Sequence, residues 1–473
     1  MDTPNILLLM TDQHRRDHVG LYGDNVATPN LDALGRRGVT FGHACSPIPL
    51  CVPARCGLMT GRSASSLGRD GGFFDNVTWL SPDDATLAGT CRAAGYRLGM
   101  VGKNHAFTAE ELRRWDAVES YAFHGKEADV SRTPPTAADE RVRQWRQANV
   151  PYFEAAVHEP QPGDLADDPA VRQTDDALAF LAAADDRPFF LYLSYEAPHF
   201  PYVLPEPLFS QADPDAVDDV ETFVDAVPTR LLAQRAGLNL DQATPADLRR
   251  VVATYRGMIR LVDEQIGRVL DGLPPDTLIL FCSDHGDYLG DRGLIGKSVT
   301  LHESLLQIPM LLAGPGVPAG VRHRAHVDLT DVAPTLLDLA GLPPLPEATG
   351  RSVAPILGDP DATHRRLVVA ERSFGRDEGM PPDEIRRVVA DRERLRAEHG
   401  EAWFLDALRG RCESVYDPAT GLKLIRHDAD ADELYDLRTD PAERRNLAGD
   451  RSNDLAVMNA LLDGTDFAAP DVW

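Results

Sequence analysis

A cysteine and an arginine stand four residues apart in the segment Cys51-Val52-Pro53-Ala54-Arg55. Pro53 favours the first turn of a helix, because its missing N–H is not needed there, so Cys51 is expected at the helix N-terminus. The helix dipole and the free amides at that end stabilise an anion. Arg55 returns to the same side of the helix and adds a forked cation. This setting predicts a reactive Cys51 with a low pKa, whereas the alternative is a buried structural thiol.

The other cysteines carry no comparable signal. We interpret Cys45, Cys91, Cys282 and Cys412 as buried structural thiols. Cys56 and Arg62 satisfy the C-x5-R spacing of a phosphatase loop, but Leu58 and Met59 between them offer apolar bulk where a phosphate cradle needs small residues and exposed amides. We therefore reject that reading and expect Leu58 and Met59 to be helix core contacts.

Groups of ionisable residues follow four short apolar runs of the chain. One such group alone would be an ordinary loop, since Asp, His and Gly are common after strands. Four groups together favour a single site. They are Thr11-Asp12-Gln13-His14, Lys103-Asn104-His105, Pro198-His199 and Asp284-His285-Gly286-Asp287.

Lysine is rare in this chain, with only four against 44 arginines. Where this chain needs only a positive charge, it uses arginine. Lys103 and Lys297 therefore indicate positions that require a compact ammonium group, which can donate hydrogen bonds or give up a proton in a crowded site. Lys126 and Lys423 we interpret as solvated surface residues.

The elements that must position these residues alternate between strands and helices, which predicts an α/β layered domain with a large mainly parallel sheet. In such a sheet the carboxyl ends of the strands border the ligand crevice, so the four groups are expected to converge there. Helices are predicted at Leu31–Gly38 and Leu248–Leu273 from glycine, proline and the spacing of apolar residues. Strands are predicted at Asn5–Met10, Arg97–Val101, Phe189–Tyr195, Thr277–Cys282 and Ile308–Ala313.

The sequence pattern changes at two points along the chain. Residues 121–186 show weak periodicity, and we interpret them as insertions over the edge of the sheet. After about Arg365 a charged helix-like run at 382–398 precedes strand candidates at 423–426 and 433–437. We predict a catalytic domain at 1–365 and, at 366–473, a smaller C-terminal α+β subdomain with a short antiparallel sheet.

The formal charge of −26 excludes nucleic acid or an anionic membrane as a bulk partner, because both attract basic surfaces. No apolar window approaches the roughly 18 to 20 residues of a membrane span. The first residues show no basic region followed by an apolar run and a cleavage site, so we expect a cytoplasmic protein.

Together these segments resemble the type I sulfatases of the alkaline phosphatase superfamily, and the resemblance covers most of the chain. It rests on Cys51-Val52-Pro53-Ala54-Arg55 with Leu58-Met59-Thr60-Gly61-Arg62, and on Asn5 to Gln13, Thr28 to Asp32, Gly102 to His105, Ser283 to Gly286 and Glu433 to Leu437 with Asp440-Pro441. The resemblance implies an alkaline-phosphatase-like fold. It also implies that a formylglycine-generating enzyme oxidises Cys51 to formylglycine (3-oxoalanine), whose hydrate offers one hydroxyl to attack sulfur and a second to expel sulfate.

The resemblance further implies a role for each site residue. Arg55 would hold the formylglycine hydrate, Lys103 would bind a sulfate oxygen, His105 would accept the second hydroxyl's proton, and His199 and Lys297 would serve the departing oxygen. One divalent cation would act as Lewis acid, with Ca²⁺ expected first and Mn²⁺ as the alternative. Its ligands would be Asp12, Gln13, Cys51, Asp284 and His285.

Two positions depart from the common sulfatase pattern. Gln13 and His285 replace a second aspartate and an asparagine, which softens the metal site and is similar to phosphonate monoester hydrolases and choline-sulfatase-like enzymes. Lys103 and His105, which those phosphonate hydrolases typically lack, favour a sulfate ester over a phosphonate or phosphodiester. A metal-binding module without turnover is the alternative from another class. The substrate, a small-molecule or saccharide sulfate ester, and the oligomeric state stay open.

Overall fold

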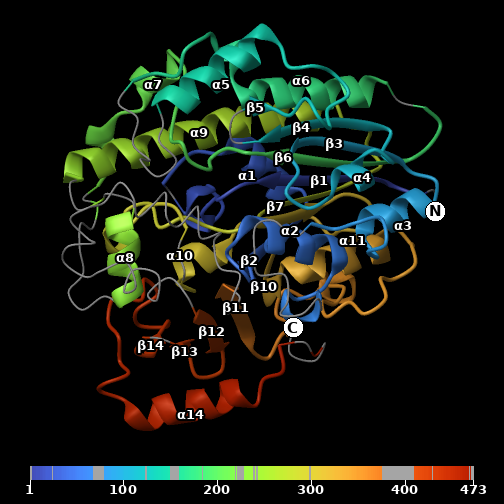
Figure 1. The fold of residues 1–473 in the computed structure, drawn as a ribbon. Coiled ribbons are helices and arrows are strands. Elements are labelled where there is room, and N and C mark those ends of the chain that lie inside the picture. Colours follow the sequence, from blue (N-terminus) through green and yellow to red (C-terminus); the bar gives the residue numbers. More distant parts are fainter. Residues whose placement is uncertain are drawn as a thin grey trace.

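The computed structural model describes most of the chain as two sheets with their helices (Figure 1). The larger sheet occupies the middle of the molecule, and the smaller one lies below it in this view. The described residues are 3–23, 25–67, 79–122, 125–149, 159–183, 185–218, 220, 228–237, 240, 243–297, 300–374, 410–428, 430–467 and 469.

The larger sheet has ten strands in the described part of the chain. Across the sheet they are β10 (Val321–Asp328), β2 (Val39–Cys45), β9 (Met310–Ala313), β7 (Thr277–Ser283), β1 (Asn5–Thr11), β6 (Phe189–Tyr195), β3 (Arg97–Lys103), β4 (Ala117–Ala122) and β5 (Gly125–Lys126), while β8 (Gln307–Ile308) pairs with β2. The run from β7 through β1, β6 and β3 to β4 is parallel, and β9 is antiparallel to β7. The mainly parallel sheet predicted from the sequence is confirmed.

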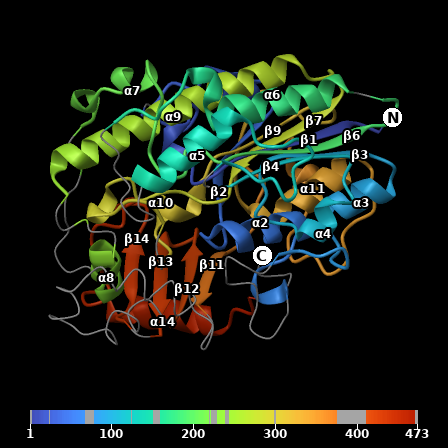
Figure 2. The same ribbon diagram turned by 45° about the horizontal axis from the view of Figure 1, so that its top comes forward.

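Strand β1 shows why the sheet lies in the interior. All five residues from Ile6 to Met10 are buried, with Ile6, Leu8 and Met10 in one apolar core and Leu7 and Leu9 in another. Alternate side chains of a strand point to opposite faces, so a continuous apolar strand requires cover on both faces. Helices supply that cover above and below the sheet (Figure 2).

The helices of the upper layer are α1 (Pro29–Arg36), α6 (Pro169–Ala182) and α9 (Pro245–Asp271), and those of the lower layer include α2 (Cys51–Thr60), α3 (Leu87–Ala93), α4 (Ala109–Leu112) and α11 (Val332–Leu339). Both helices predicted from the sequence are confirmed. α9 begins before Leu248, because Thr244 and Asp247 form a reciprocal capping box at its start.

The interpretation of residues 121–186 as insertions over the sheet edge is wrong for α6. Ala177 and Phe180 of α6 are buried in the upper core, and α6 packs on α9, β3 and β6. It is therefore part of the helical layer. The segment also holds α5 (Ala137–Asn149), and the remaining described α-helices are α7 (Leu208–Gln211), α8 (Thr229–Gly237), α10 (Glu303–Leu306) and α14 (Ser452–Asp463).

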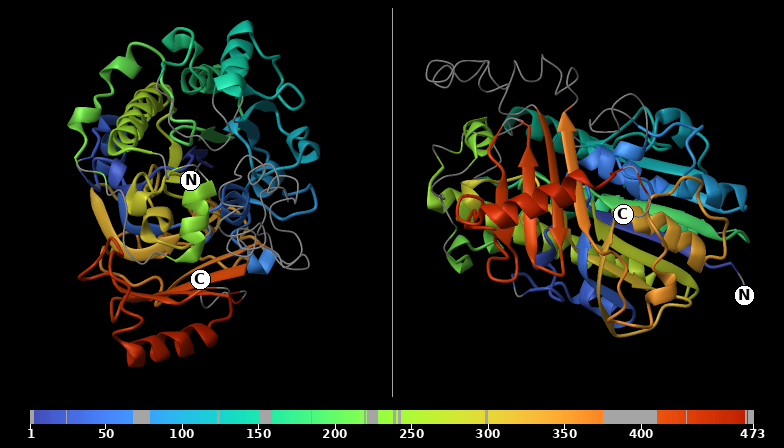
Figure 3. Two further views of the ribbon diagram at one scale, coloured as in Figure 1. Left: turned by 60° about the vertical axis from the view of Figure 1, so that its left-hand side comes forward. Right: turned by 90° about the horizontal axis from the view of Figure 1, so that it is seen from below.

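The smaller sheet is antiparallel and consists of β11 (Val368–Phe374), β12 (Gly410–Asp417), β13 (Leu422–His427) and β14 (Glu433–Asp436). α14 covers its outer face through Met458 and Leu462 (Figure 3). The other face packs on Leu306, the last residue of α10, and on Leu301 just before this helix. Both predicted strand segments are confirmed. The charged run at 382–398 lies outside the described residues, and the boundary between 365 and 366 stays a prediction.

The interpretation of Lys126 and Lys423 as solvated surface residues is wrong. The Lys126 side chain is buried and forms ion pairs with Glu119 at 2.7 Å and Asp176 at 3.1 Å. Lys423 is 1% exposed and pairs with two glutamates. A buried ammonium ion is tolerated only when such partners replace its water, so both lysines are held by fixed carboxylates.

Two features are absent from the described residues: a helix that could span a membrane and a disulfide bond. Among these residues, no helix combines the length and apolar character that crossing a membrane requires. All six cysteines have free thiols and are buried, and burial raises the pKa of Cys45, Cys91, Cys282 and Cys412. The interpretation of these four as structural thiols fits this placement. Leu58 and Met59 are fully buried core residues, as expected.

Candidate active site

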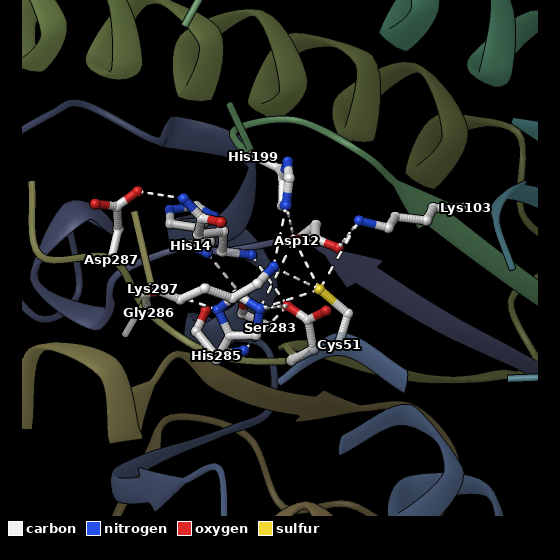
Figure 4. Close-up of polar contacts among 12 residues, drawn as sticks. Asp12, His14, Cys51, Lys103, His199, Ser283, His285, Gly286, Asp287 and Lys297 are labelled. Atoms are coloured by element: carbon white, nitrogen blue, oxygen red, sulfur yellow. Dashed lines mark hydrogen bonds and ion pairs between the residues drawn. The ribbon is translucent and has the colours of Figure 1, made fainter. Parts of the chain in front are cut away.

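The site lies at the carboxyl ends of β1, β3, β6 and β7, where the four ionisable groups meet the start of α2 (Figure 4). Cys51 is the first residue of α2, directly after Leu50 in extended conformation. The placement of Cys51 at a helix N-terminus, expected from Pro53, is thus observed.

Three side-chain nitrogen atoms lie near the Cys51 sulfur. Its Sγ lies 2.8 Å from Lys297 Nζ, 3.3 Å from His285 Nε2 and 3.9 Å from Lys103 Nζ. Burial and Asp12 act to raise the pKa of Cys51, but the two lysines and His285 outweigh them and lower it. An anionic oxygen at the position of this sulfur would be stabilised in the same way.

Four potential metal ligands converge at this point. One donor atom from each of Asp12, Cys51, Asp284 and His285 lies within 4.8 Å of the others, and all four residues are buried. The His285 Nδ1 lies 2.9 Å from the Gly286 carbonyl oxygen, so Nδ1 carries the proton and the Nε2 lone pair faces the cluster.

The fifth expected ligand, Gln13, presents an unused oxygen. Its backbone has a φ of 64°, in the left-handed region, and its Oε1 is buried without a hydrogen-bond partner among the described residues. A buried amide oxygen normally has a partner. Two carboxylates, an amide oxygen, an imidazole nitrogen and the atom of residue 51 form a donor set that fits one divalent cation.

Asp287 fixes the orientation of Gln13, a role that its place in the sequence does not indicate. Its Oδ2 accepts hydrogen bonds from Gln13 Nε2 at 2.5 Å and from the Tyr202 hydroxyl at 2.6 Å. Its Oδ1 accepts from the backbone amides of Leu289 and Gly296. Because the Gln13 amide nitrogen is held by this carboxylate, Oε1 must point the other way, as a metal ligand would require.

Replacing Asp287 by asparagine should therefore weaken metal binding. The new amide would place a donor against the Gln13 amide nitrogen, which we expect to raise the metal dissociation constant by about 10- to 100-fold. Activity should recover when excess metal is added. Metal titration monitored by activity and by calorimetry measures the effect. Asp291→Asn is the matched control, since the Asp291 carboxylate is half-exposed and pairs with Arg15; equal metal affinity in both variants would refute the role of Asp287.

Arg55 is buried and orients two carboxylates of the cluster. Its Nη2 donates to Asp12 Oδ2 and its Nε to Asp284 Oδ2, both at 2.9 Å. Its Nη1 donates to the hydroxyls of Tyr192 and Ser194, each at 2.7 Å. The family resemblance implies that Arg55 holds the group at position 51. These contacts show that its guanidinium also orients the carboxylates of Asp12 and Asp284.

Lys103 and His105 lie on the side of β3. Lys103 Nζ is 2.7 Å from Asp12 Oδ2, and although burial lowers the pKa of Lys103, Asp12 and Cys51 raise it well above its usual value. Burial, together with Lys103 and Arg55, holds the pKa of His105 well below its usual range. Lys103 is therefore a fixed cation beside a neutral imidazole.

His199 and Lys297 meet on the opposite side of the sulfur. His199 Nδ1 lies 2.6 Å from the Phe200 carbonyl oxygen and so carries the proton, while Nε2 accepts from Lys297 Nζ at 3.2 Å. Burial and then Lys103 hold the pKa of His199 well below its usual range. In this contact Lys297 is the hydrogen-bond donor and the neutral His199 ring is the acceptor.

The aromatic residues near the site have different tasks. Phe107 is buried against Trp115 and belongs to the lower core. Tyr202 is buried and bonds to Asp287, whereas Phe200 stacks on His199 with ring centroids 4.3 Å apart. Of the three, Phe200 is the one that contacts a side chain placed around the sulfur.

Comparisons with known proteins agree with this geometry. The family model described as Sulfatase matches residues 4–342. The choline-sulfatase of Rhizobium meliloti (strain 1021) is 30% identical, covering 97% of this chain and 86% of its own length. The arylsulfatase of Clostridium perfringens (strain 13 / Type A) is 29% identical, covering 79% and 82%. The solved phosphonate monoester hydrolase of Agrobacterium radiobacter has a TM-score of 0.72 at 23% identity, covering 97% of this chain and 95% of its own, so the two share a fold.

Proposed function

Because this chain belongs to the sulfatase family, it is a sulfuric ester hydrolase, and we propose that it works through a formylglycine made from Cys51 and one divalent cation. The observation that carries the proposal is the position of Cys51. Its sulfur is one of the clustered metal donors and also lies 2.8 Å from Lys297 Nζ and 3.9 Å from Lys103 Nζ. A nucleophilic oxygen at this position would be activated by the bound cation, and the two ammonium groups would stabilise the negative charge that develops during attack on sulfur.

The cation, held by Asp12, Gln13, residue 51, Asp284 and His285, would act as a Lewis acid and lower the pKa of the attacking hydroxyl. Ca²⁺ is the first expectation, and Mn²⁺ suits the neutral Gln13 and the nitrogen of His285. Arg55 holds Asp12 and Asp284 in the geometry that such a cation requires.

The remaining residues divide between the sulfate and the departing alcohol. Lys103, fixed on Asp12, would bind a sulfate oxygen, and the neutral His105 would accept a proton from the second hydroxyl of residue 51. On the other side Lys297, directed by His199, would donate a proton to the ester oxygen as it leaves.

The substrate is proposed to be a small-molecule or saccharide sulfate ester. The two relatives named above, one a choline-sulfatase and one an arylsulfatase, support a sulfate ester. The shared fold with a phosphonate monoester hydrolase keeps the phosphonate or phosphodiester as the second candidate. A cytoplasmic location and maturation of Cys51 by a formylglycine-generating enzyme complete the proposal.

A direct comparison of esters tests it. Matured, metal-loaded protein is assayed with 4-nitrophenyl sulfate, 4-nitrophenyl phenylphosphonate and bis(4-nitrophenyl) phosphate, which share a leaving group. We expect kcat/KM for the sulfate to exceed the other two by at least about tenfold. A preference for either phosphorus ester would reverse the assignment, and choline, alkyl and carbohydrate sulfates then identify the class of alcohol.

A further inference from the structure

We infer that Glu433, on the smaller sheet, is a positioning residue for Lys297, so that the C-terminal region takes part in delivering the proton to the leaving group. This inference rests on the proposed function for the role of Lys297. Its structural basis is a set of contacts in two branches. In the first, Glu433 on β14 pairs with Arg230 of α8, and Gln234 of the same helix donates to the Lys297 backbone. The second runs from Glu433 through His302 to Tyr288.

Glu433 is the common partner in a buried polar cluster. Its side chain is 1% exposed, yet burial is outweighed by His302 and other donors, which hold the pKa of Glu433 well below its usual range. An ionised carboxylate in this place must have its oxygens satisfied. Oε1 accepts from Arg230 and lies 3.3 Å from His427, and Oε2 accepts from the Tyr435 hydroxyl at 2.6 Å and lies 3.1 Å from His302.

Arg230 carries the connection into α8. It is 3% exposed, pairs with Glu433 and lies 3.4 Å from Asp430. Gln234 follows four residues later, on the same face of the helix. The Gln234 side chain donates to the backbone carbonyl oxygen of Lys297 at 2.7 Å, and Arg235 donates to the Gly293 carbonyl at 3.1 Å.

His302 carries the second branch. Burial and then Arg292 lower the pKa of His302 to about 3, so the ring is neutral. Its Nε2 donates to Glu433, and its Nδ1 lies 2.7 Å from the Tyr288 hydroxyl. The segment 288–297 is therefore held near both ends from the C-terminal side. Asp287, through the amides of Leu289 and Gly296, holds it from the active-site side.

The need for this support follows from the position of Lys297. Its Nζ, which lies 2.8 Å from Cys51 Sγ here, must be held where it can reach the departing ester oxygen, and misplacing a proton donor by about 1 Å can cost about 100-fold in rate. The segment 288–297 contains no strand. A 3₁₀ turn at Asp291–Gly293 and backbone hydrogen bonds from Tyr288 to Gly296 and from Gly290 to Leu294 close it into a loop, so its position in the molecule depends on the contacts that hold this loop from outside.

Replacing Glu433 by glutamine tests the inference. An ester with a poor leaving group depends on protonation, whereas a nitrophenyl ester leaves without it. In Glu433→Gln we expect kcat for an alkyl sulfate to fall by about tenfold or more, and kcat for 4-nitrophenyl sulfate to fall by less than about threefold. Glu413→Gln is the matched control, because Glu413 pairs with Arg411 and Arg426 within the same sheet. It should behave as the parent.

The double variant separates positioning from simple destabilisation. With Lys297→Ala in place, Glu433→Gln should cause no further loss on the alkyl sulfate, since the two changes act through one group. Gln234→Ala removes the hydrogen bond to the Lys297 carbonyl oxygen and should also slow the alkyl sulfate more than the nitrophenyl sulfate. This variant keeps the test decisive if Glu433→Gln folds poorly. Equal losses on both esters, or additive losses with Lys297→Ala, would overturn the inference.

Hydrogen exchange gives a readout that does not depend on the reaction. Amides of residues 288–296 should exchange faster in Glu433→Gln than in Glu413→Gln, with β1 and α2 unchanged. Unchanged exchange in 288–296 would also overturn the inference. If the parent prefers a phosphorus ester, the proposed function fails, while the same pair of good and poor leaving groups on that ester still decides the role of Glu433.

Discussion

Cys51→Ala should lower kcat/KM by at least about 10⁴-fold while leaving the fold intact. The Cys51 sulfur lies 2.8 Å from Lys297 Nζ, 3.3 Å from His285 Nε2 and 3.9 Å from Lys103 Nζ. Removing the nucleophile of an enzyme that forms a covalent bond to its substrate leaves only binding and charge stabilisation. Alanine is small, uncharged and compatible with a helix start inside a protein, so the helix should persist.

The matched control is Cys56→Ala, in the same helix. Cys56 is also buried, but its Sγ lies 3.7 Å from the Ala106 carbonyl and it belongs to the lower apolar core. We expect Cys56→Ala to keep kcat/KM within about threefold, at a cost in stability near 1 kcal/mol. Steady-state kinetics, circular dichroism and thermal unfolding of both variants decide. A Cys51→Ala protein that keeps more than about a hundredth of the activity would refute the nucleophile assignment.

Removal of the metal should lower activity by at least about 10³-fold, because the attacking hydroxyl then keeps its ordinary pKa. The protein should remain folded. Asp12 and Asp284 stay paired with Arg55, and Asp12 also with Lys103, so no carboxylate of the cluster is left without a cation. Dialysis against a chelator, metal analysis and activity after adding back Ca²⁺ or Mn²⁺ make the measurement.

A change of one ligand sharpens this test. His285→Asn replaces the nitrogen donor by an amide oxygen, which should shift the preference from Mn²⁺ toward Ca²⁺. Fully active protein after verified removal of divalent ions would contradict the metal assignment. An unchanged order of metals in His285→Asn would contradict the role of His285 alone.

The sequence was most informative where local chemistry determines local structure. Pro53 placed Cys51 at the start of a helix, and apolar runs such as Asn5–Met10 placed Asp12 and Gln13 at the carboxyl end of a buried strand. Because the carboxyl ends of parallel strands share one edge, the meeting of these residues followed from the fold class.

What the sequence did not show depends on partners far along the chain. Lys423 resembles a surface lysine until Glu303, 120 residues earlier, is brought beside it by the packing of the smaller sheet. In the sequence Asp287 looks like an ordinary polar loop residue. Its role depends on a hydrogen bond from the side-chain amide of Gln13, which is 274 residues away along the chain. The position of helix α6 was missed for a local reason, since the polar residues Gln173 and Thr174 lie on its buried face and weaken the apolar pattern.

The most direct test of the account is mass spectrometry of the peptide that contains residue 51, from protein made in its native host. We expect the peptide to be lighter by the difference between the CH₂SH group of cysteine and the CHO group of formylglycine, and to react with a hydrazide. A peptide that carries only the intact thiol, from protein that hydrolyses a sulfate ester, would contradict the central claim.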